Sequence, residues 1–516
     1  MSAIKSLLSN LPKSGSKKVT EAGSTDETAL TASAESRSAS AQAPEASAEG
    51  QSRDKEAREN ASAKDEGGTT SKKEAKDSAP VKREGGTTSK KIEEALPPAP
   101  VSQEDENKIS KLRQISQMWR FLPIPEGPEA SVERRADAVQ CGNACVMGAS
   151  VRGKKHAHGG TDCDDWFEIR TEEKTGAIFI AVSDGAGSKK YSRIGAKASC
   201  KAAVESLRES FLRLSEEQPG RLRELRLSAG RESDSDAQSL WRGIMSTAML
   251  KAREALYFAF EKRISDPAYE SLQSFRDLSA TLLLAVVLPS QSGEHTVSVC
   301  QVGDGAMALF RSDAPYEEAM SLLGTPDSGD YAGETEFMTS PSLTEEAFEK
   351  RVTTRSLRFD AMFVMTDGVA DDYFPANPEL FRLYFDLTAN GVLPPKRTPP
   401  PAEPIPVPAP LDFSGAAEEK DSAPLNYVWL IRSATKRSLK DLWEDASPLE
   451  RASRFLPARE GAKKSGERLE YWLEHYVEAA SFDDRTLVVV RLEEGGESDG
   501  AKEENHEKRE ADGDSV

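Results

Sequence analysis

Cysteine is scarce in this sequence, and its pattern excludes several kinds of site. The five cysteines are an odd number and none stands in a C-x-x-C pair, so we expect neither a disulfide framework nor a structural zinc site. One alternative stays open from the residues alone, in which Cys141, Cys145 and Cys163 bind a metal together with a histidine. Acidic neighbours on both sides of Cys163 disfavour its thiolate, and no cysteine lies in a loop suited to hold phosphate. The residues therefore argue against thiol chemistry.

Long apolar runs are also missing. The longest run, Leu282–Leu288, has the length of a strand, whereas a membrane-spanning helix needs about 20 apolar residues. The first residues lack an apolar core long enough for a secretory signal. A formal net charge of -19 argues against binding to nucleic acid. We therefore expect a cytoplasmic protein with neither a membrane nor a nucleic acid as its partner.

Aromatic residues are almost absent from residues 1–110, which consist mainly of small, polar and charged residues. Such a segment buries too little apolar surface to offset the entropy lost on ordering, so we expect a disordered low-complexity tail. Residues 493–516 predict a second, acidic disordered tail. A proline-rich insertion at about 393–425 predicts a stiff connector, although its P-x-x-P spacing also suits an aromatic-lined partner. Residues 115–492, within which this insertion lies, are expected to form one domain.

Within that domain, acidic turns repeatedly adjoin apolar strands. The run IFIAVS at 178–183 leads directly into Asp184 and Gly185. The same pairing of a strand with an acid recurs at Asp164 and Asp165, Asp304, Asp367, and Asp483. Each case alone is explained by the preference of Asp and Gly for turns. Together, carboxylates that converge at one sheet edge repel one another unless a cation lies among them, and oxygen ligands suit Mg²⁺ or Mn²⁺.

The order of these motifs resembles that of the metal-dependent protein phosphatases of the type 2C class, in particular their bacterial branch. The matching segments read GASVRGKKHAHGGTDCDDWF, IFIAVSDGAGS, LSATLLLAVVL, VSVCQVGDGAMALFR, DAMFVMTDGVADD and SFDDRTLVVVRL. They span roughly residues 147–492, apart from insertions. The resemblance implies an α+β fold, a four-layer sandwich in which two stacked antiparallel β-sheets are flanked by helices on both faces. It also implies a two-metal site at one edge of the sandwich.

The resemblance also implies roles for individual residues. The implied metal ligands are Asp164, Asp165, Asp184, Gly185, Asp304, Asp367 and Asp483. Among these, Asp184 and Asp367 are the implied catalytic residues, because they hold the metal-bound water that attacks phosphorus. The implied cofactors are two Mn²⁺ or Mg²⁺ ions, with a third, weaker site at Asp304. Asp484 stands where relatives often have Asn, so we expect it to support the ligands.

Two positions depart from the family pattern. Ala186 replaces a histidine that some relatives use to protonate the leaving group, and Gly160 falls where animal relatives have a phosphate-binding arginine. His156 and Lys155 are the expected phosphate contacts instead, although His156 is equally compatible with a solvated loop residue. The acid that protonates the leaving group is therefore not identified from the sequence.

The implied function is a serine/threonine protein phosphatase of signalling type, which hydrolyses phosphoprotein monoesters with water as the nucleophile. Its expected partners are phosphorylated Ser/Thr proteins and a cognate Ser/Thr kinase. A second hypothesis is a catalytically silent phosphatase-like module that binds phosphorylated partners or acts as a scaffold. Ala186 and the missing arginine favour the second hypothesis, while the intact Asp184, Asp367 and Asp483 favour the first.

Apolar periodicity and the family pattern predict the remaining elements. We expect helices at 194–214 and 240–263, a loop or partly helical insertion at 216–238, a flap at 313–348 that shapes substrate choice, and two or three helices within 426–476. Trp443, Trp472 and Tyr476 are expected to be core residues of those last helices.

Overall fold

The computed structural model describes most of the expected domain. The described residues are 107, 119–227, 235–290, 293–327, 335–373, 379–394, 437–445, 462–476 and 482–492. Apart from residue 107, the predicted tails lie outside these residues, as does nearly all of the proline-rich insertion.

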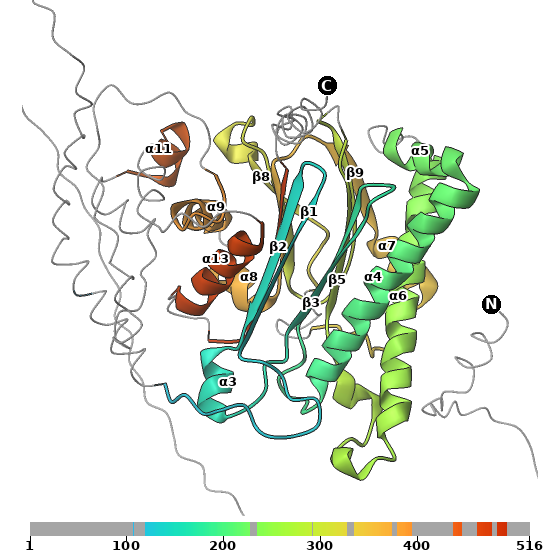
Figure 1. Ribbon diagram of the computed structural model, residues 1–516, viewed down its shortest axis with the longest axis vertical. Coiled ribbons are helices and arrows are strands. Elements are labelled where there is room, and N and C mark those ends of the chain that lie inside the picture. The colour runs from blue at the N-terminus through green and yellow to red at the C-terminus, as the bar shows by residue number, and fades with distance from the viewer. Residues whose placement is uncertain are drawn as a thin grey trace, which may run out of the picture. The chain divides into compact units, whose positions relative to one another are not determined.

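Two antiparallel sheets form the centre of the domain (Figure 1). The first has six strands in the order β1 (Arg134–Cys141), β2 (Ala144–Val151), β11 (Arg485–Leu492), β10 (Ala361–Met365), β7 (Ala306–Phe310) and β8 (Met320–Leu323). The second has five strands in the order β3 (Trp166–Glu172), β4 (Ala177–Ser183), β5 (Leu282–Leu288), β6 (His295–Val302) and β9 (Thr353–Leu357). All neighbouring strands are antiparallel, which confirms the predicted sheets.

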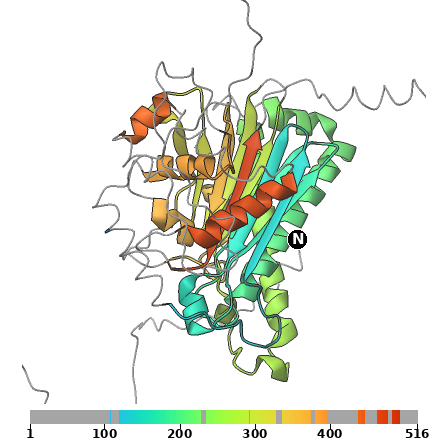
Figure 2. The same cartoon turned by 60° about the vertical axis from the view of Figure 1, so that its left-hand side comes forward.

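Helices cover the outer face of each sheet. The second sheet is covered by α4 (Ser192–Glu217), α5 (Pro219–Leu227), α6 (Ser235–Arg263) and α7 (Glu345–Arg351), and the first by α8 (Asp367–Tyr373), α9 (Glu379–Ala389), α11 (Leu439–Glu444) and α13 (Ala462–His475). Short 3₁₀ turns lie at Pro267–Tyr269, Phe275–Leu278 and Tyr316–Glu318. Figure 2 shows α13 lying across β1 and β2. The four-layer α+β sandwich is therefore confirmed.

Burial on both faces explains why the central strands are apolar along their whole length. β4, with the sequence AIFIAVS, and β5, with LLLAVVL, are buried at every position. Alternate residues enter different cores: Phe179 packs toward the helices, whereas Ile180 packs toward the other sheet. A strand enclosed by a sheet on one side and helices on the other therefore has no solvent face that needs polar residues.

The predicted helices are present with somewhat different ends. The helices expected at 194–214 and 240–263 are α4 and α6, and part of the stretch between them forms α5. The stretch expected as a flap contains β8, which extends the first sheet, while residues 328–334 lie outside the described part. Trp443, Trp472 and Tyr476 are buried as predicted. None of the helices in the described ranges is long and apolar enough to cross a membrane.

Replacing a buried phenylalanine tests the helix-facing core. Phe179 is fully buried in β4 and its ring lies 5.2 Å from that of Phe211 in α4. We expect Phe179→Ala to lower the free energy of unfolding by about 3–5 kcal/mol, measured by urea titration. The matched control is Phe258→Ala in α6, where the side chain is 60% exposed and the expected change is within about 0.5 kcal/mol. Equal effects of the two substitutions would contradict the assigned core.

Candidate functional site

The strand pairing brings the acidic turns to one edge of each sheet. In the first sheet, the end of β10 pairs with the starts of β7 and β11. Asp304 precedes β7, Asp367 follows β10 and Asp483 precedes β11, so these acids share an edge. In the second sheet, the start of β3 pairs with the end of β4, which places Asp165 beside Asp184. Within each sheet, the antiparallel register thus brings together carboxylates that are far apart in the sequence.

The two edges lie close together, since carboxylates of one sheet shift the pKa of an acid on the other. Burial raises the pKa of Asp184 well above its usual value, and the negative charges of Asp367, Asp165 and Asp304 raise it further. Burial also raises the pKa of Asp367 to about 7, with a further contribution from Asp304. The site therefore carries more negative charge than its surroundings compensate.

Two threonines fix the orientation of this cluster. The backbone N–H of Asp184 donates to Thr281 Oγ1 at 2.8 Å, and the N–H of Thr281 donates back to the carbonyl of Asp184 at 2.8 Å. Thr366 Oγ1 donates to Asp165 Oδ2 at 2.8 Å, which leaves the buried atom Oδ1 of Asp165 without a hydrogen-bond partner. These contacts hold the carboxylates on the ends of rigid strands.

The glycines that follow two of the acids are required by close packing. A Cβ atom on Gly185 would lie 2.7 Å from the carbonyl oxygen of Asp164 and 2.9 Å from the Ser192 side chain. A Cβ on Gly368 would lie 1.8 Å from the carbonyl oxygen of Asp484. Only glycine lets these backbones approach so closely, so both Asp-Gly pairs join one acidic turn to the next.

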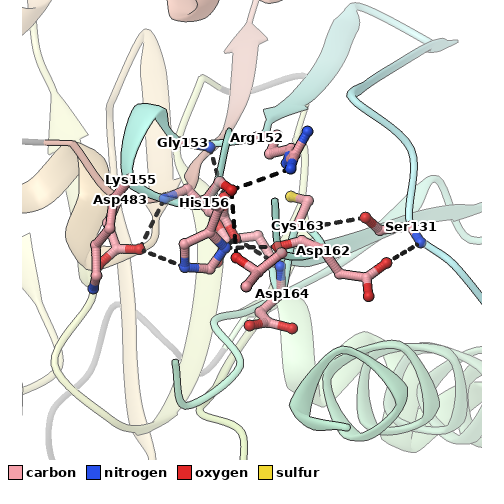
Figure 3. Close-up of polar contacts among 12 residues, drawn as sticks. Ser131, Arg152, Gly153, Lys155, His156, Asp162, Cys163, Asp164 and Asp483 are labelled. Carbon is pink, nitrogen blue, oxygen red and sulfur yellow. Dashed lines mark hydrogen bonds and ion pairs between the residues drawn. The ribbon is translucent and has the colours of Figure 1, made fainter. Parts of the chain in front are cut away.

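A histidine contacts both acids that precede β11, and Figure 3 shows its ring directed at Asp483. His156, on the short helix α3 (Lys154–Gly159), places Nε2 at 3.2 Å from Asp483 Oδ1 and Nδ1 at 2.9 Å from Asp484 Oδ2. Lys155 Nζ lies 2.9 Å from Asp483 Oδ2. The carboxylate of Asp484 also accepts the backbone N–H groups of Gly153 and Asp164, each at 2.6 Å. Asp484 thereby ties α3 and the start of β3 to the start of β11.

This network sets the charges of its members. Burial by itself lowers the pKa of His156, but its hydrogen bonds to Asp483 and Asp484 outweigh that effect and raise the pKa to about 11. Burial by itself raises the pKa of Asp483, but hydrogen bonds from His156 and Lys155 bring it well below its usual value. His156 is therefore cationic and Asp483 anionic at neutral pH. Asp164 differs, since burial and the charge of Asp484 raise its pKa to about 7.

The donor set fits a hard divalent cation by its chemistry. The candidate donors are oxygens, the cluster has excess negative charge, and the buried Oδ1 atoms of Asp165 and Asp304 have no hydrogen-bond partner. Within the ranges that the structure describes, however, no three His, Cys, Asp or Glu side chains are already arranged to hold a metal ion. The same finding gives no support to a metal site at Cys141, Cys145 and Cys163, none of which forms a disulfide bond.

One acid of the cluster was missed by the sequence analysis. Asp371 lies one turn after Asp367 in α8, and burial together with the charges of Asp304 and Asp483 raises its pKa. Residues four apart on a helix share a face, so the spacing in DGVADD was the signal that pointed to Asp371.

The family model described as Protein phosphatase 2C matches residues 152–398. Two solved structures, RsbX in complex with magnesium and the serine/threonine phosphatase Stp1 from Staphylococcus aureus, are 10% and 12% identical to this chain. The match to RsbX covers 70% of this chain and 100% of the other, with a TM-score of 0.29; for Stp1 the values are 72%, 99% and 0.32. No curated protein matches this chain.

A glycine-to-alanine pair tests the close approach of the acidic turns. We expect Gly368→Ala to lower the free energy of unfolding by about 3 kcal/mol, because the new methyl group meets the backbone of Asp484. The control is Gly243→Ala in α6, where a Cβ meets nothing within 4 Å and the expected change is a gain of about 0.5–1 kcal/mol. Chemical denaturation measures both, and a harmless Gly368→Ala would contradict the packing described.

Proposed function

The chain belongs to the protein phosphatase 2C family, and from that premise we propose that it is a metal-dependent phosphatase of phosphoserine and phosphothreonine proteins. The observation that carries the proposal is the cluster of Asp184, Asp367, Asp165 and Asp304, whose mutual repulsion calls for cations. Its proposed substrates are phosphorylated proteins, and a cognate kinase and a cytoplasmic location stay predictions.

The proposed ligands divide by position. Asp184, the carbonyl of Gly185 and Asp367 would hold the ions and so position the water that attacks phosphorus. Asp483 and the acids before β3 would complete the ligand set. Asp304 is proposed for a third, weaker ion. Bound Mg²⁺ or Mn²⁺ supplies Lewis-acid chemistry, which lowers the pKa of water and neutralises charge on the phosphoryl oxygens. The chain itself contributes fixed carboxylates on strand ends, so little reorganisation is needed when the substrate binds.

One of the two cations on α3 is proposed to bind the substrate phosphate. Lys155 is more than half exposed and lies beside Asp483, so its ammonium group is accessible next to the carboxylate cluster. His156 is cationic but buried and held between two acids, which suits it to positioning Asp483 and Lys155. Lys155 is thus the better candidate for contact with phosphate. Ala186 has no proton to donate, so the leaving-group acid is not assigned.

A second candidate function rests on a specific observation. Both carboxylate oxygens of Asp483 are already paired with cations of the chain, Lys155 and His156, so this acid is neutralised without a metal. A phosphatase-like module that binds phosphorylated partners without hydrolysing them is compatible with that arrangement. The measurements below separate the two functions.

Hydrolysis of a phosphothreonine peptide and of para-nitrophenyl phosphate tests the catalytic proposal. With Mn²⁺ or Mg²⁺ we expect turnover that EDTA abolishes and that Asp184→Asn or Asp367→Asn lowers by about a hundredfold or more, because each removes a charge from the cluster. The control Asp137→Asn removes an exposed acid of β1 outside the cluster and should leave turnover unchanged. A folded wild-type chain with no turnover in any metal would support the silent module instead.

Lys155→Ala tests the phosphate contact. At saturating Mn²⁺ we expect a loss of about tenfold in kcat/KM, mainly through KM, because one charge-assisted hydrogen bond to phosphate is removed. The control is Lys174→Ala, whose side chain is 63% exposed and pairs with Glu216 at 2.9 Å, in the turn between β3 and β4 at the opposite edge of the sheet. An unchanged KM for Lys155→Ala would rule out this contact.

A further inference from the structure

Arg351, the last residue of α7, joins three parts of the chain that surround the turn of Asp304. Its Nη1 atom donates to the carbonyl of Gln301 at 3.1 Å and lies 2.5 Å from Asp327 Oδ1. Its Nη2 atom lies 2.5 Å from Glu336 Oε2. The guanidinium therefore binds the end of β6 and two acids from the stretch that follows β8.

Asp327 connects Arg351 to the backbone of the turn that contains Asp304. Its Oδ2 accepts the N–H of Gly303 at 2.8 Å, and its own N–H donates to the carbonyl of Gly303 at 3.0 Å. Gly303 has φ of +113°, a conformation that residues with a side chain rarely adopt, and a Cβ there would lie 2.5 Å from Thr281. Gln301 Nε2 adds hydrogen bonds to the carbonyls of Gly303 and Gly305 at 3.0 and 2.6 Å. The unusual turn is thus held from both sides.

Glu336 also connects Arg351 to the side chain of Asp304, through the neighbouring residue Thr335. The preceding residue, Thr335, donates from Oγ1 to Asp304 Oδ2 at 2.5 Å. This hydrogen bond occupies one oxygen of Asp304, while the buried atom Oδ1 has no partner and stays available as a donor to a cation. Because Arg351 holds Glu336, it also holds the residue that orients Asp304.

Arg351 also compensates the negative charges of two acids. The side chains of its two acidic partners, Asp327 and Glu336, are 17% and 25% exposed, so solvent screens their charges only in part. Without the guanidinium, Asp327 would place an uncompensated negative charge beside Gly303, next to an acid cluster that already repels itself.

We propose that Arg351 is a positioning residue that sets the backbone turn and the carboxylate orientation of Asp304 through Asp327, Glu336 and Thr335. The part of this inference that concerns cation binding at Asp304 rests on the proposed function. The clamp itself, meaning the contacts of Arg351 with Gln301, Asp327 and Glu336, does not.

Hydrogen exchange of the full chain in EDTA tests the clamp without metal. We expect Arg351→Ala to speed exchange of the Gly303 amide by about tenfold, because its acceptor Asp327 is released. The matched control is Arg355→Ala, which removes the same charge from an exposed position on β9. Unchanged protection at Gly303 in Arg351→Ala, or equal loss in both variants, would overturn the clamp.

Titration with Mn²⁺, followed by electron paramagnetic resonance, tests the consequence for Asp304. We expect Arg351→Ala to weaken the weakest bound ion by about tenfold, as Asp304→Asn does, with partial recovery in Arg351→Lys. The double variant should bind no more weakly than Asp304→Asn alone, since both changes act through one carboxylate. Additive effects would contradict positioning through Asp304. A wild-type chain that binds no Mn²⁺ would contradict the proposed function, while the exchange measurement would still decide the clamp.

Discussion

Repulsion among buried carboxylates at one edge of the sandwich is the constraint on which the rest of the site depends. Asp184 and Asp367 follow strands of different sheets, yet the negative charge of Asp367 raises the cost of ionising Asp184. Such a cluster is stable only if protons, cations of the chain or metal ions balance it. At the periphery of the site, cations of the chain balance part of this negative charge. At its centre, metal ions are proposed to balance the rest.

At the periphery, the chain uses its own cations. His156 and Lys155 neutralise Asp483, and Asp484 anchors the helix that carries both of them. On the far side, Arg351 balances Asp327 and Glu336 beside the turn of Asp304. Between these two groups, the oxygens of Asp165 and Asp304 that lack partners mark the part of the site where positive charge is missing. This division between a compensated rim and an uncompensated centre supports the proposal that the centre binds cations.

Several features of the fold were predictable because they depend on neighbours in sequence. The apolar runs of β4, β5 and β10 each predicted a strand, and the strands lie where those runs are. The periodic segments that became α4 and α6 were predicted within a few residues of their ends. The acids were found for the same reason, since each directly adjoins a strand. Asp371 was missed because its signal depends on helical spacing within a segment that had been assigned to a turn.

The sequence by itself determined the strands, the two long helices and the acids at the strand ends, because each depends on residues within a few positions of one another. Only the tertiary structure decided which side chains compensate those acids. His156 meets Asp484 at a separation of 328 positions in the sequence, and Arg351 is linked to Gly303 through Asp327. Such contacts depend on strand register and on how the sheets stack, so no local pattern of residue types encodes them.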